Sequence, residues 1–275
     1  MADYYGTDTV VSELREDGLL IIRINRPEVA NALNGATSDA MENIMNHAEK
    51  DKAVRAIIVT GTGKVFCAGE DLSELSEGGE CQTVTEHGFG GITLVCAPSP
   101  SCGMQRLRCW RRHGIALSCD MVVAAENAKF GCTEVGLGII ASTGGIVRLA
   151  RDINRKDCME LLLTGKKIKA PEAKELGLIN YVVPAEEVMD KAIELAEQVL
   201  KNAPLALKWT KYLVHAADRC LRKTRCATAT VLIASSRRPK TASRARWPSP
   251  RSAPPTGLAA NSSELQLLPG AARPP

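Results

Sequence analysis

The stretch RAIIVTGTGKVFCAGEDL, residues 55–72, changes character twice. Residues 56–61 form a short, continuously apolar run, which is typical of a strand buried on both faces. A glycine-containing loop follows, and an acidic residue, Asp71, marks the expected start of a helix. This order of strand, loop and helix is typical of an α/β protein.

The loop in this stretch has more than one interpretation. GTGK at 61–64 resembles part of a phosphate-binding loop, but the required spacing before Gly-Lys-Ser/Thr is absent, which argues against nucleotide hydrolysis. The turn FCAGEDL at 66–72 would leave backbone N–H groups pointing outward, ready for an anion or a developing oxyanion. A plain helix cap explains the same residues equally well, so this turn alone leaves both interpretations open.

The flanking sequence alternates strands and helices. Apolar runs on either side of Asp17-Gly18 predict a β-hairpin, and 34–50 predicts a helix with Thr37 or Ser38 as its N-cap. Further strands are expected in 121–131 and 180–184, and further helical segments in 142–153, 155–165, 170–179 and 185–217. This alternation implies crossover connections and mainly parallel strand pairing, followed by a purely helical region.

Composition and targeting signals indicate an ordinary globular protein. The chain has 275 residues, of which 45% are hydrophobic and 24% charged. The residues after Met1 lack the apolar core of a signal peptide, and no stretch has the length of a membrane span, so a cytoplasmic protein without a membrane partner is expected. Five cysteines stand singly, without CxxC pairs or matching histidines, which predicts buried thiols: Cys67, Cys81, Cys119, Cys132 and Cys158.

Basic residues gather in two places. The net charge is +4, and from Arg219 to the end the only acidic residue is Glu264. Such a tail indicates either polyanion binding or a solvated, disordered end, and its aperiodic Pro, Ser, Arg and Ala favour disorder. A second cluster, at 106–113, mixes four arginines with Trp110 and His113. Interleaved Arg and aromatic residues suggest nucleic-acid binding, unless this stretch was never selected for a function.

One acidic residue stands out by its surroundings. Glu134 lies in KFGCTEVGLGIIASTGG, residues 129–145, which is otherwise almost entirely apolar or small. Apolar surroundings raise the pKa of a carboxyl group, which suits a general acid or base. A surface glutamate at a strand end is the simpler interpretation when the residue is considered by itself.

Taken together, these segments resemble the crotonase superfamily of enoyl-CoA hydratases and isomerases. The resemblance runs from about Thr9 to Ala217. It is carried, in order and spacing, by RINRPEVANALN, RAIIVTGTGKVFCAGEDL, GFGGIT, ALSCDMVVAAENAKFGCTEVGLGIIASTGGIVRL, MELLLTGKKIKAPEAKELGLINYVV and NAPLALKWTK. The resemblance implies an α/β fold, a crotonase-like spiral of ββα repeats over 1–200, and a C-terminal helical trimerisation region that starts at 201–218. The GFGGIT and STGGIVRL variants look similar to the carnitine-pathway branch, the crotonobetainyl-CoA hydratases.

The family resemblance also implies a reaction and a site. The reaction is syn addition of water to a trans-2-enoyl-CoA, through a thioester enolate stabilised by two backbone N–H groups. The resemblance assigns the first N–H to Glu70 and one catalytic carboxylate to Glu134. It assigns binding of coenzyme A and substrate to Ala30, Ala68, Glu70, Asp71, Leu72 and Ser73, with the Ala68 carbonyl accepting from the adenine amino group. It implies no metal, and no cofactor besides the coenzyme A of the substrate.

The segment SPSCGMQRLRCWRRHGIALSCD, residues 99–120, departs from this pattern. The family has a glycine run with a glutamate just before IALSCD, and it draws its second N–H from the middle glycine. Here Arg111 stands at the glycine position and Gly114 at the glutamate position. Codons that encode MQRLRCWRRHGI can, when shifted by one base, encode CNGFAVGGGME, which is the missing motif.

The tail permits the same interpretation. RCLRKTRCATAT (219–230) and PKTASRARWPSPRSAPPTG (239–257) can both be encoded by codons that give family-like C-terminal segments in another frame. We therefore interpret the segment before IALSCD and residues 219–275 as frameshifted, with the tail disordered. Out-of-frame GC-rich codons also explain the excess of arginine, so a nucleic-acid partner is not expected.

Three alternatives to a working hydratase stay open at this level. Some relatives that only shift a double bond use a single carboxylate of the Glu134 type, which makes an isomerase the nearest alternative. A carnitine-pathway dehydratase or hydratase is the second alternative. The third is an inactive crotonase-like scaffold whose basic tail binds a polyanion. The parent enzyme is expected to bind an acyl-CoA thioester and to form a homotrimer or hexamer.

Overall fold

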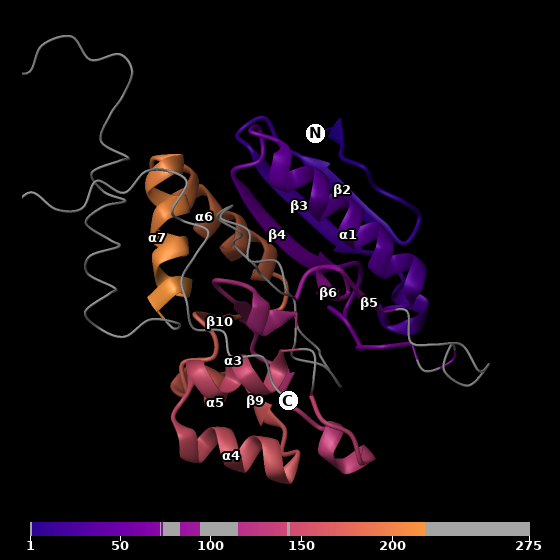
Figure 1. The fold of residues 1–275 in the computed structure, drawn as a ribbon, viewed down its shortest axis with the longest axis vertical. Helices are drawn as coiled ribbons and strands as arrows, with labels where there is room; N and C mark the ends of the chain where they lie inside the picture. The colour runs from indigo at the N-terminus through magenta and orange to yellow at the C-terminus, as the bar shows by residue number, and fades with distance from the viewer. Residues whose placement is uncertain (1, 72, 74–82, 94–114, 142–143, 218–275) are drawn as a thin grey trace, which may run out of the picture. The chain divides into compact units, whose positions relative to one another are not determined.

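Four N-terminal strands form the largest sheet of the described chain, in the order β1-β2-β3-β4 (Figure 1). The computed structural model describes residues 2–71, 73, 83–93, 115–141 and 144–217, all within one unit, Met1–Leu232. β2 pairs antiparallel with β1 and β3, whereas β3 pairs parallel with β4. The strands are β1 (Ala2–Asp3), β2 (Val10–Leu14), β3 (Leu19–Ile24) and β4 (Ala56–Gly61).

The turn between β2 and β3 confirms the hairpin predicted around Asp17-Gly18. The N–H of Gly18 donates to the carbonyl of Arg15 at 3.1 Å, and the N–H of Arg15 donates to the carbonyl of Leu19 at 2.9 Å. These two bonds close the turn and align the two strands.

Helix α1 (Gly35–Lys50) carries the chain from β3 across to β4, but its cap differs from the prediction. Asn34 is the N-cap residue, and its Oδ1 accepts from the N–H of Thr37 at 3.0 Å and from the Thr37 hydroxyl at 2.6 Å. The expected caps, Thr37 and Ser38, lie inside the helix. An asparagine before the first turn satisfies N–H groups that have no partner within the helix, so the helix starts earlier.

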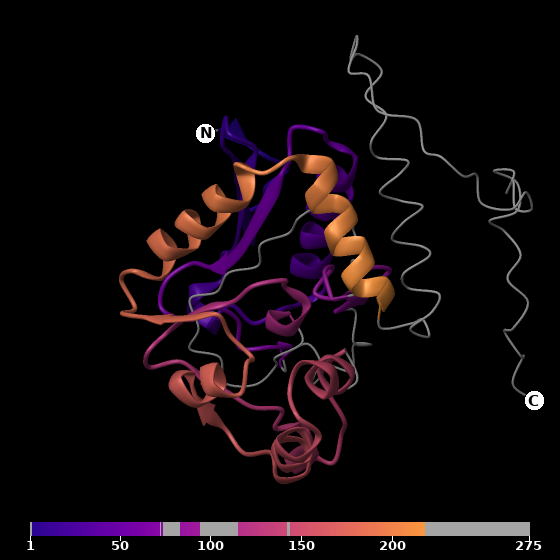
Figure 2. The ribbon, with the colours of Figure 1, turned by 90° about the vertical axis from the view of Figure 1, so that its left-hand side faces the viewer.

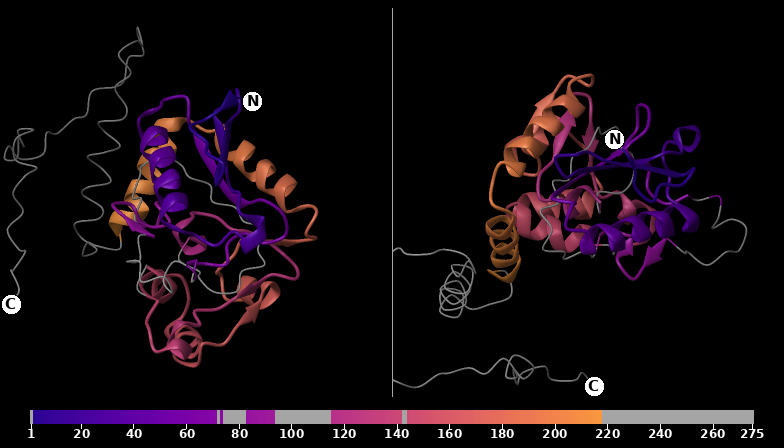
Figure 3. Two further views of the ribbon diagram at one scale, coloured as in Figure 1. Left: turned by 90° about the vertical axis from the view of Figure 1, so that its right-hand side faces the viewer. Right: turned by 90° about the horizontal axis from the view of Figure 1, so that it is seen from above.

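Both faces of β3 are buried, against different helices. Leu20 and Ile22 belong to the core cluster that contains α1, whereas Leu19 and Ile21 belong to the cluster that contains α6 (Val188–Leu200). Figure 3 shows α1 and α6 on opposite sides of the sheet. All six residues of β4 are buried, which confirms the strand predicted from the continuous apolar run.

The remaining strands are short. They are β5 (Val84–Thr85), β6 (Gly88–Phe89), β7 (Val123–Ala125), β8 (Lys129–Phe130), β9 (Ile168–Lys169) and β10 (Tyr181–Val183). The strand predicted in 121–131 is thus two strands, β7 and β8. Mainly parallel pairing is wrong for the described strands, because four of their pairs are antiparallel, namely β1–β2, β2–β3, β5–β6 and β8–β9, and two are parallel, namely β3–β4 and β7–β10. A short turn, as in β5–β6, can connect only antiparallel neighbours.

Short helices connect these strands. The 3-10 helices are η1 (Pro27–Val29), η2 (Ala116–Ser118) and η3 (Glu134–Leu137), and the α-helices are α3 (Gly145–Asp152), α4 (Arg155–Thr164) and α5 (Ala170–Glu175). α4 packs against α3 and η3, and α5 packs against β8, β9 and β10. Figure 2 shows α3, α4 and α5 grouped together at the lower end of the view. Their α/β arrangement confirms the predicted fold class.

The C-terminal segment predicted as one helical stretch over 185–217 is divided. α6 ends at Leu200, and α7 (Pro204–Ala217) begins at a proline. Proline lacks the N–H that a helix interior needs, and its fixed φ suits the first turn, so the break falls before Pro204. The Nζ of Lys211 in α7 lies 2.8 Å from Oδ2 of Asp120, which ties this helix to the loop before β7.

Candidate functional site

The turn after β4 is built against the segment around Ala30. Phe66 and Cys67 are buried, and the N–H of Ala68 donates to the carbonyl of Ala30 at 3.0 Å. Ala30 has a φ of +54°, so this segment bends sharply where it meets the turn. The structure therefore brings together two of the residues that the sequence assigned to substrate binding, although they lie far apart in the chain.

Glu70 forms a parallel bridge with Leu33, and this bridge sets the direction of its backbone. The N–H of Leu33 donates to the carbonyl of Gly69 at 2.7 Å, and the N–H of Asp71 donates to the carbonyl of Leu33 at 2.8 Å. Because successive residues of an extended chain point their N–H groups to opposite sides, the N–H of Glu70 points away from Leu33. Gly69 makes this path available, since its φ of +100° disfavours any residue with a side chain.

Arg26 connects the two segments that meet at this turn. Its Nη2 lies 2.9 Å from Oδ2 of Asp71, and its Nη1 donates to the carbonyl of Ala32 at 2.7 Å. The N–H of Arg26 donates to Oδ1 of Asn31 at 2.8 Å, and Asn31 Nδ2 in turn donates to the carbonyl of Thr62 at 2.9 Å. Asn31 is fully buried, so these bonds fix the loop before α1 against the loop after β4.

The carboxylate of Asp71 also accepts from Ser73. The Ser73 hydroxyl donates to Oδ1 of Asp71 at 2.6 Å, and the Ser73 N–H donates to the same oxygen at 3.2 Å. The hydroxyl bond lowers the pKa of Asp71; burial opposes this effect, and the Ser73 N–H and Arg26 reinforce it, so that the pKa lies below its ordinary 3.8. Asp71 thus accepts two hydrogen bonds from Ser73, while the N–H of Glu70 points away from Leu33. The rest of the helix expected from Asp71 lies outside the described residues.

Glu134, the predicted catalytic carboxylate, is buried on a separate element. It begins η3, and its side chain is 7% exposed. Its carbonyl accepts from the N–H of Ile139 at 3.2 Å, and η3 packs against α4. The interpretation of Glu134 as an ordinary surface glutamate is therefore wrong.

Several predicted site residues lie outside the described part of the chain. They are Leu72, Arg111 and Gly114. The basic cluster at 106–113, Cys81 and the tail from Arg219 also lie outside it. Cys67, Cys119, Cys132 and Cys158 are described and form no disulfide; all but Cys119, which is half-buried, are buried as predicted.

Four residues that organise this region were not among the predicted site residues. They are Arg26, Asn31, Thr83 and His87. Nδ1 of His87 lies 2.9 Å from Oε1 of Glu42. Thr83 donates its hydroxyl to Oε1 of Glu70 at 2.9 Å. No local pattern marks such residues, because each of these contacts joins segments that are distant in the sequence; only the RINRPEVANALN segment hinted at Arg26 and Asn31.

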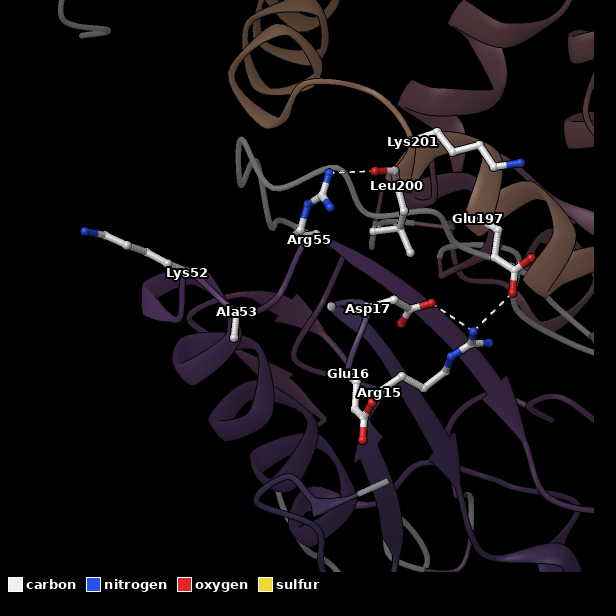
Figure 4. A pocket seen from close by; sticks show the side chains of 10 residues that line it. Arg15, Glu16, Asp17, Lys52, Ala53, Arg55, Glu197, Leu200 and Lys201 are labelled. Atoms are coloured by element: carbon white, nitrogen blue, oxygen red, sulfur yellow. Dashed lines mark hydrogen bonds and ion pairs between the residues drawn. The ribbon is translucent and has the colours of Figure 1, made fainter. Parts of the chain in front are cut away.

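A surface pocket of about 620 Å³ is lined by other residues, at the β2–β3 turn, the start of β4 and the end of α6 (Figure 4). Nη2 of Arg15 lies 2.8 Å from Oδ2 of Asp17 and 3.1 Å from Oε1 of Glu197. Arg55 donates from Nη2 to the carbonyl of Leu200 at 2.7 Å. The two arginines thus bind the protein's own carboxylates and carbonyls, and the pocket contains none of the predicted site residues.

The described residues contain neither a metal-binding cluster nor a membrane-spanning helix. No group of three or more His, Cys, Asp or Glu side chains there could hold a metal ion. None of the helices in those ranges combines the length and apolarity that crossing a membrane requires.

Comparison with known proteins gives a consistent result. The family model described as enoyl-CoA hydratase/isomerase matches residues 15–94 and 113–241. The match thus omits 95–112, most of the arginine-rich stretch, and continues past Asp218. A short-chain-enoyl-CoA hydratase from Clostridium acetobutylicum is 36% identical over 215 residues, covering 75% of this chain and 81% of that protein.

Two further relatives point the same way. A carnitinyl-CoA dehydratase from Proteus mirabilis is 35% identical over 206 residues, covering 73% of this chain and 78% of that protein. The crystal structure of an enoyl-CoA hydratase from Mycobacterium tuberculosis H37Rv superposes with a TM-score of 0.77 at 32% identity, covering 84% of this chain and 90% of that one.

Proposed function

The chain belongs to the enoyl-CoA hydratase/isomerase family, and we propose on this basis that its site is built for syn addition of water to a trans-2-enoyl-CoA thioester. A relative named short-chain-enoyl-CoA hydratase, at 36% identity, and one named 2,3-dehydroadipyl-CoA hydratase, at 31% identity, support hydration as the reaction. The single observation that carries the site assignment is the Leu33–Glu70 bridge, which turns one backbone N–H away from the paired segment.

In this proposal, the N–H of Glu70 donates to the thioester carbonyl oxygen. As the water oxygen bonds to the β-carbon, the electron pair of the double bond moves toward this carbonyl and forms an enolate. A fixed N–H at that oxygen stabilises the developing charge, and one such donor contributes about 3–4 kcal/mol. The glycine conformation at Gly69 and the two bonds to Leu33 keep this N–H fixed before substrate arrives.

Glu134 is proposed to transfer the second proton. One proton of the attacking water must go to a base, and a proton must reach the α-carbon to complete the addition. Glu134 delivers the proton to the α-carbon, or removes it in dehydration. Its burial supports the proposal, because a carboxyl group shielded from bulk water can exchange a proton with the substrate alone.

The family has the glutamate that activates water at the position of Gly114. It has the glycine that supplies the second N–H at the position of Arg111. As written, the chain has no carboxylate at the first position and a bulky residue at the second. We propose that both result from the frameshift, and the omission of 95–112 from the family match supports this. Resequencing the coding DNA across codons 94–116 and 217–258 tests it: restored frames would return the glycine run and the second glutamate.

The coenzyme A portion is proposed to bind along Ala30, Ala68, Asp71, Leu72 and Ser73, with the carbonyl of Ala68 accepting from the adenine amino group. The hydrogen bond between Ala68 and Ala30 and the ion pair between Arg26 and Asp71 support a rigid wall there. The proposed reaction requires only proton transfers and charge stabilisation. It therefore uses no metal, and no cofactor besides the coenzyme A of the substrate.

Double-bond isomerisation is a second candidate for the chain as written. The specific observation in its favour is Gly114, which leaves Glu134 as the only carboxylate at the proposed catalytic positions. An isomerase needs to move one proton between carbons and has no water to activate.

Assembly into a homotrimer, or a dimer of trimers, is also proposed. Helix α7 exposes Leu205, Tyr212 and Val214, which are large apolar side chains. Exposed apolar side chains grouped on one helix suit contact with other subunits.

Hydration of crotonyl-CoA, followed by loss of the enoyl-thioester absorbance, tests the proposed site. We expect Glu134→Gln to abolish whatever turnover the chain shows, with unchanged binding of coenzyme A. If Glu134→Gln retains full turnover, the assignment of Glu134 is wrong.

A further inference from the structure

The residue proposed to supply the backbone donor is also held through its side chain. The hydroxyl of Thr83 donates to Oε1 of Glu70 at 2.9 Å. Thr83 is 2% exposed, and Glu70 is half-buried, so water competes little for this bond. A hydrogen bond to a charged acceptor is among the stronger hydrogen bonds that proteins form.

This bond complements the backbone bonds of the same turn. On one edge, Leu33 binds the peptide groups that flank Glu70. These bonds hold the segment around Glu70 from one side, so they resist rotation of the segment about its own axis less than they resist its displacement. Such a rotation would change the direction of the Glu70 N–H. A second anchor on the side chain of Glu70 opposes that rotation.

Thr83 can serve as an anchor because the hairpin that follows it is itself fixed. The carbonyl of Thr83 accepts from the N–H of Gly90 at 2.8 Å, which closes the β5–β6 hairpin. Gly91 then packs directly on α1, where a Cβ would lie 2.5 Å from the backbone nitrogen of Glu42. Only glycine allows so close an approach of the hairpin to the helix.

The tip of the hairpin is bound to the same helix. The N–H of His87 donates to Oε1 of Glu42 at 2.8 Å, and Nδ1 of His87 lies 2.9 Å from the same oxygen. The N-cap of α1 is Asn34, the residue after Leu33. These contacts connect Leu33 to α1, α1 to the β5–β6 hairpin, and the hairpin to Thr83. Thr83 in turn binds Glu70, which pairs with Leu33.

We propose that Thr83 is a positioning residue, which orients the peptide N–H of Glu70 toward the thioester carbonyl through the Glu70 carboxylate. This inference rests on the proposed function, in which that N–H polarises the carbonyl. It gives the side chain of Glu70 a role that the family resemblance does not assign to it.

The test uses butyryl-CoA labelled with ¹³C at the thioester carbonyl. This saturated thioester cannot be hydrated, and the stretching frequency of its bound carbonyl reports polarisation by N–H donors. The variants are Thr83→Val, which removes the hydroxyl at nearly constant shape, and Thr83→Ser, which retains it. Thr60→Val is the matched control, because Thr60 is equally buried and its hydroxyl has no hydrogen-bond partner in the described chain.

The full-length wild-type chain is expected to lower the carbonyl frequency of bound butyryl-CoA relative to the free thioester. Thr83→Val should lose most of this shift and bind butyryl-CoA roughly threefold to tenfold more weakly, the equivalent of one lost hydrogen bond. Its affinity for free coenzyme A should not change. Thr83→Ser should restore the shift, and Thr60→Val should keep it.

Other outcomes separate the two levels of the proposal. If the wild type shows the shift and Thr83→Val keeps it in full, the role of Thr83 is wrong and the proposed site stands. If neither the wild type nor the chain with CNGFAVGGGME in place of MQRLRCWRRHG lowers the carbonyl frequency of butyryl-CoA, the proposed site is wrong and this inference fails with it. If Thr83→Val does not fold, Glu70→Ala replaces it, because that variant keeps the backbone N–H and removes the anchor; retention of the full shift in Glu70→Ala would overturn the inference.

Discussion

Nη2 of Arg26 lies 2.9 Å from Oδ2 of Asp71, in an ion pair whose side chains are only 15% and 11% exposed. The same guanidinium donates to the carbonyl of Ala32. One side chain thus joins the loop before α1 to the loop after β4, on either side of the Leu33–Glu70 bridge. The position of the proposed donor therefore depends on a residue that does not touch it.

Replacement of Arg26 should destabilise the protein. Arg26→Met leaves the largely buried Asp71 carboxylate without its counter-ion, and should lower the free energy of unfolding by about 1–3 kcal/mol, the cost of an unsatisfied buried polar group. Urea denaturation at pH 7 measures it. Arg23→Met is the control, because the Arg23–Glu13 pair is more exposed and should contribute less than about 1 kcal/mol. Equal losses in the two variants would contradict a structural role for the Arg26–Asp71 pair.

Acid should lower the stability of the turn at 66–72, because it protonates Asp71. The Ser73 hydroxyl, opposed by burial and aided by Arg26, holds the pKa of Asp71 below its ordinary 3.8. A lowered carboxyl pKa contributes stability that is present above the ordinary value and lost as the pH falls through the folded-state value. The difference in unfolding free energy between wild type and Asp71→Asn should therefore shrink below about pH 4. A constant difference down to pH 2 would contradict this linkage.

Glu42 should show the same sign of pH dependence at the β5–β6 hairpin. Burial alone would raise its pKa, but hydrogen bonds from the His87 N–H, the His87 ring and Thr85, together with the charge of His87, lower it below its ordinary 4.5. Glu42→Gln should destabilise the protein by about 1–2 kcal/mol at pH 7, with the loss vanishing toward pH 3. Chemical denaturation at several pH values checks this. Oε1 of Glu49 lies farther from the His87 ring, 4.0 Å from Nε2, so Glu49→Gln should lower the stability less than Glu42→Gln does.

The cap of α1 provides a purely structural prediction. Asn34→Ala removes the acceptor for the Thr37 N–H and should cost about 1 kcal/mol of stability. Asn43→Ala, on the exposed side of the same helix, removes the same side chain where it caps nothing, and should be neutral or slightly stabilising. Thermal unfolding of both variants distinguishes them; equal effects would show that the cap contributes nothing.

Arg55 should stabilise the end of α6. Its Nη2 donates to the carbonyls of Leu200 at 2.7 Å and of Asn202 at 3.0 Å, which are groups without partners inside the helix. Arg55→Ala should lower the free energy of unfolding by about 1–2 kcal/mol. Lys52→Ala, an exposed residue of the same pocket, should change it little, and a loss as large as that of Arg55→Ala would argue against a specific cap.

The local sequence pattern predicted which helices and strands form better than it predicted where they begin and end. The continuous apolar run at 56–61 predicted β4 correctly because a strand buried on both faces needs no polar alternation. The cap at Asn34 was missed because several capping residues stand close together and only the folded backbone selects one of them. The break before Pro204 was missed because the apolar pattern continues across it, although proline at a first helical turn marks such breaks.

The site was predicted only in part for a different reason. The family resemblance assigned the turn at 66–72 and the carboxylate of Glu134 to the site, and these roles stay predictions. Sequence spacing could not indicate that Leu33 pairs with Glu70, or that Thr83 and Arg26 support this turn, because these contacts depend on how distant segments pack. Whether Arg111 and Gly114 replace a glycine and a glutamate of the parent enzyme stays a prediction, since both lie outside the described residues.

The most direct test of the proposed function compares two chains in one assay of crotonyl-CoA hydration. One is the chain as written, and the other carries CNGFAVGGGME in place of MQRLRCWRRHG. We predict that the repaired chain hydrates crotonyl-CoA, that Glu134→Gln in the repaired chain abolishes this activity, and that the chain as written shows little or none. Equal rates for both chains, unaffected by Glu134→Gln, would contradict the proposal.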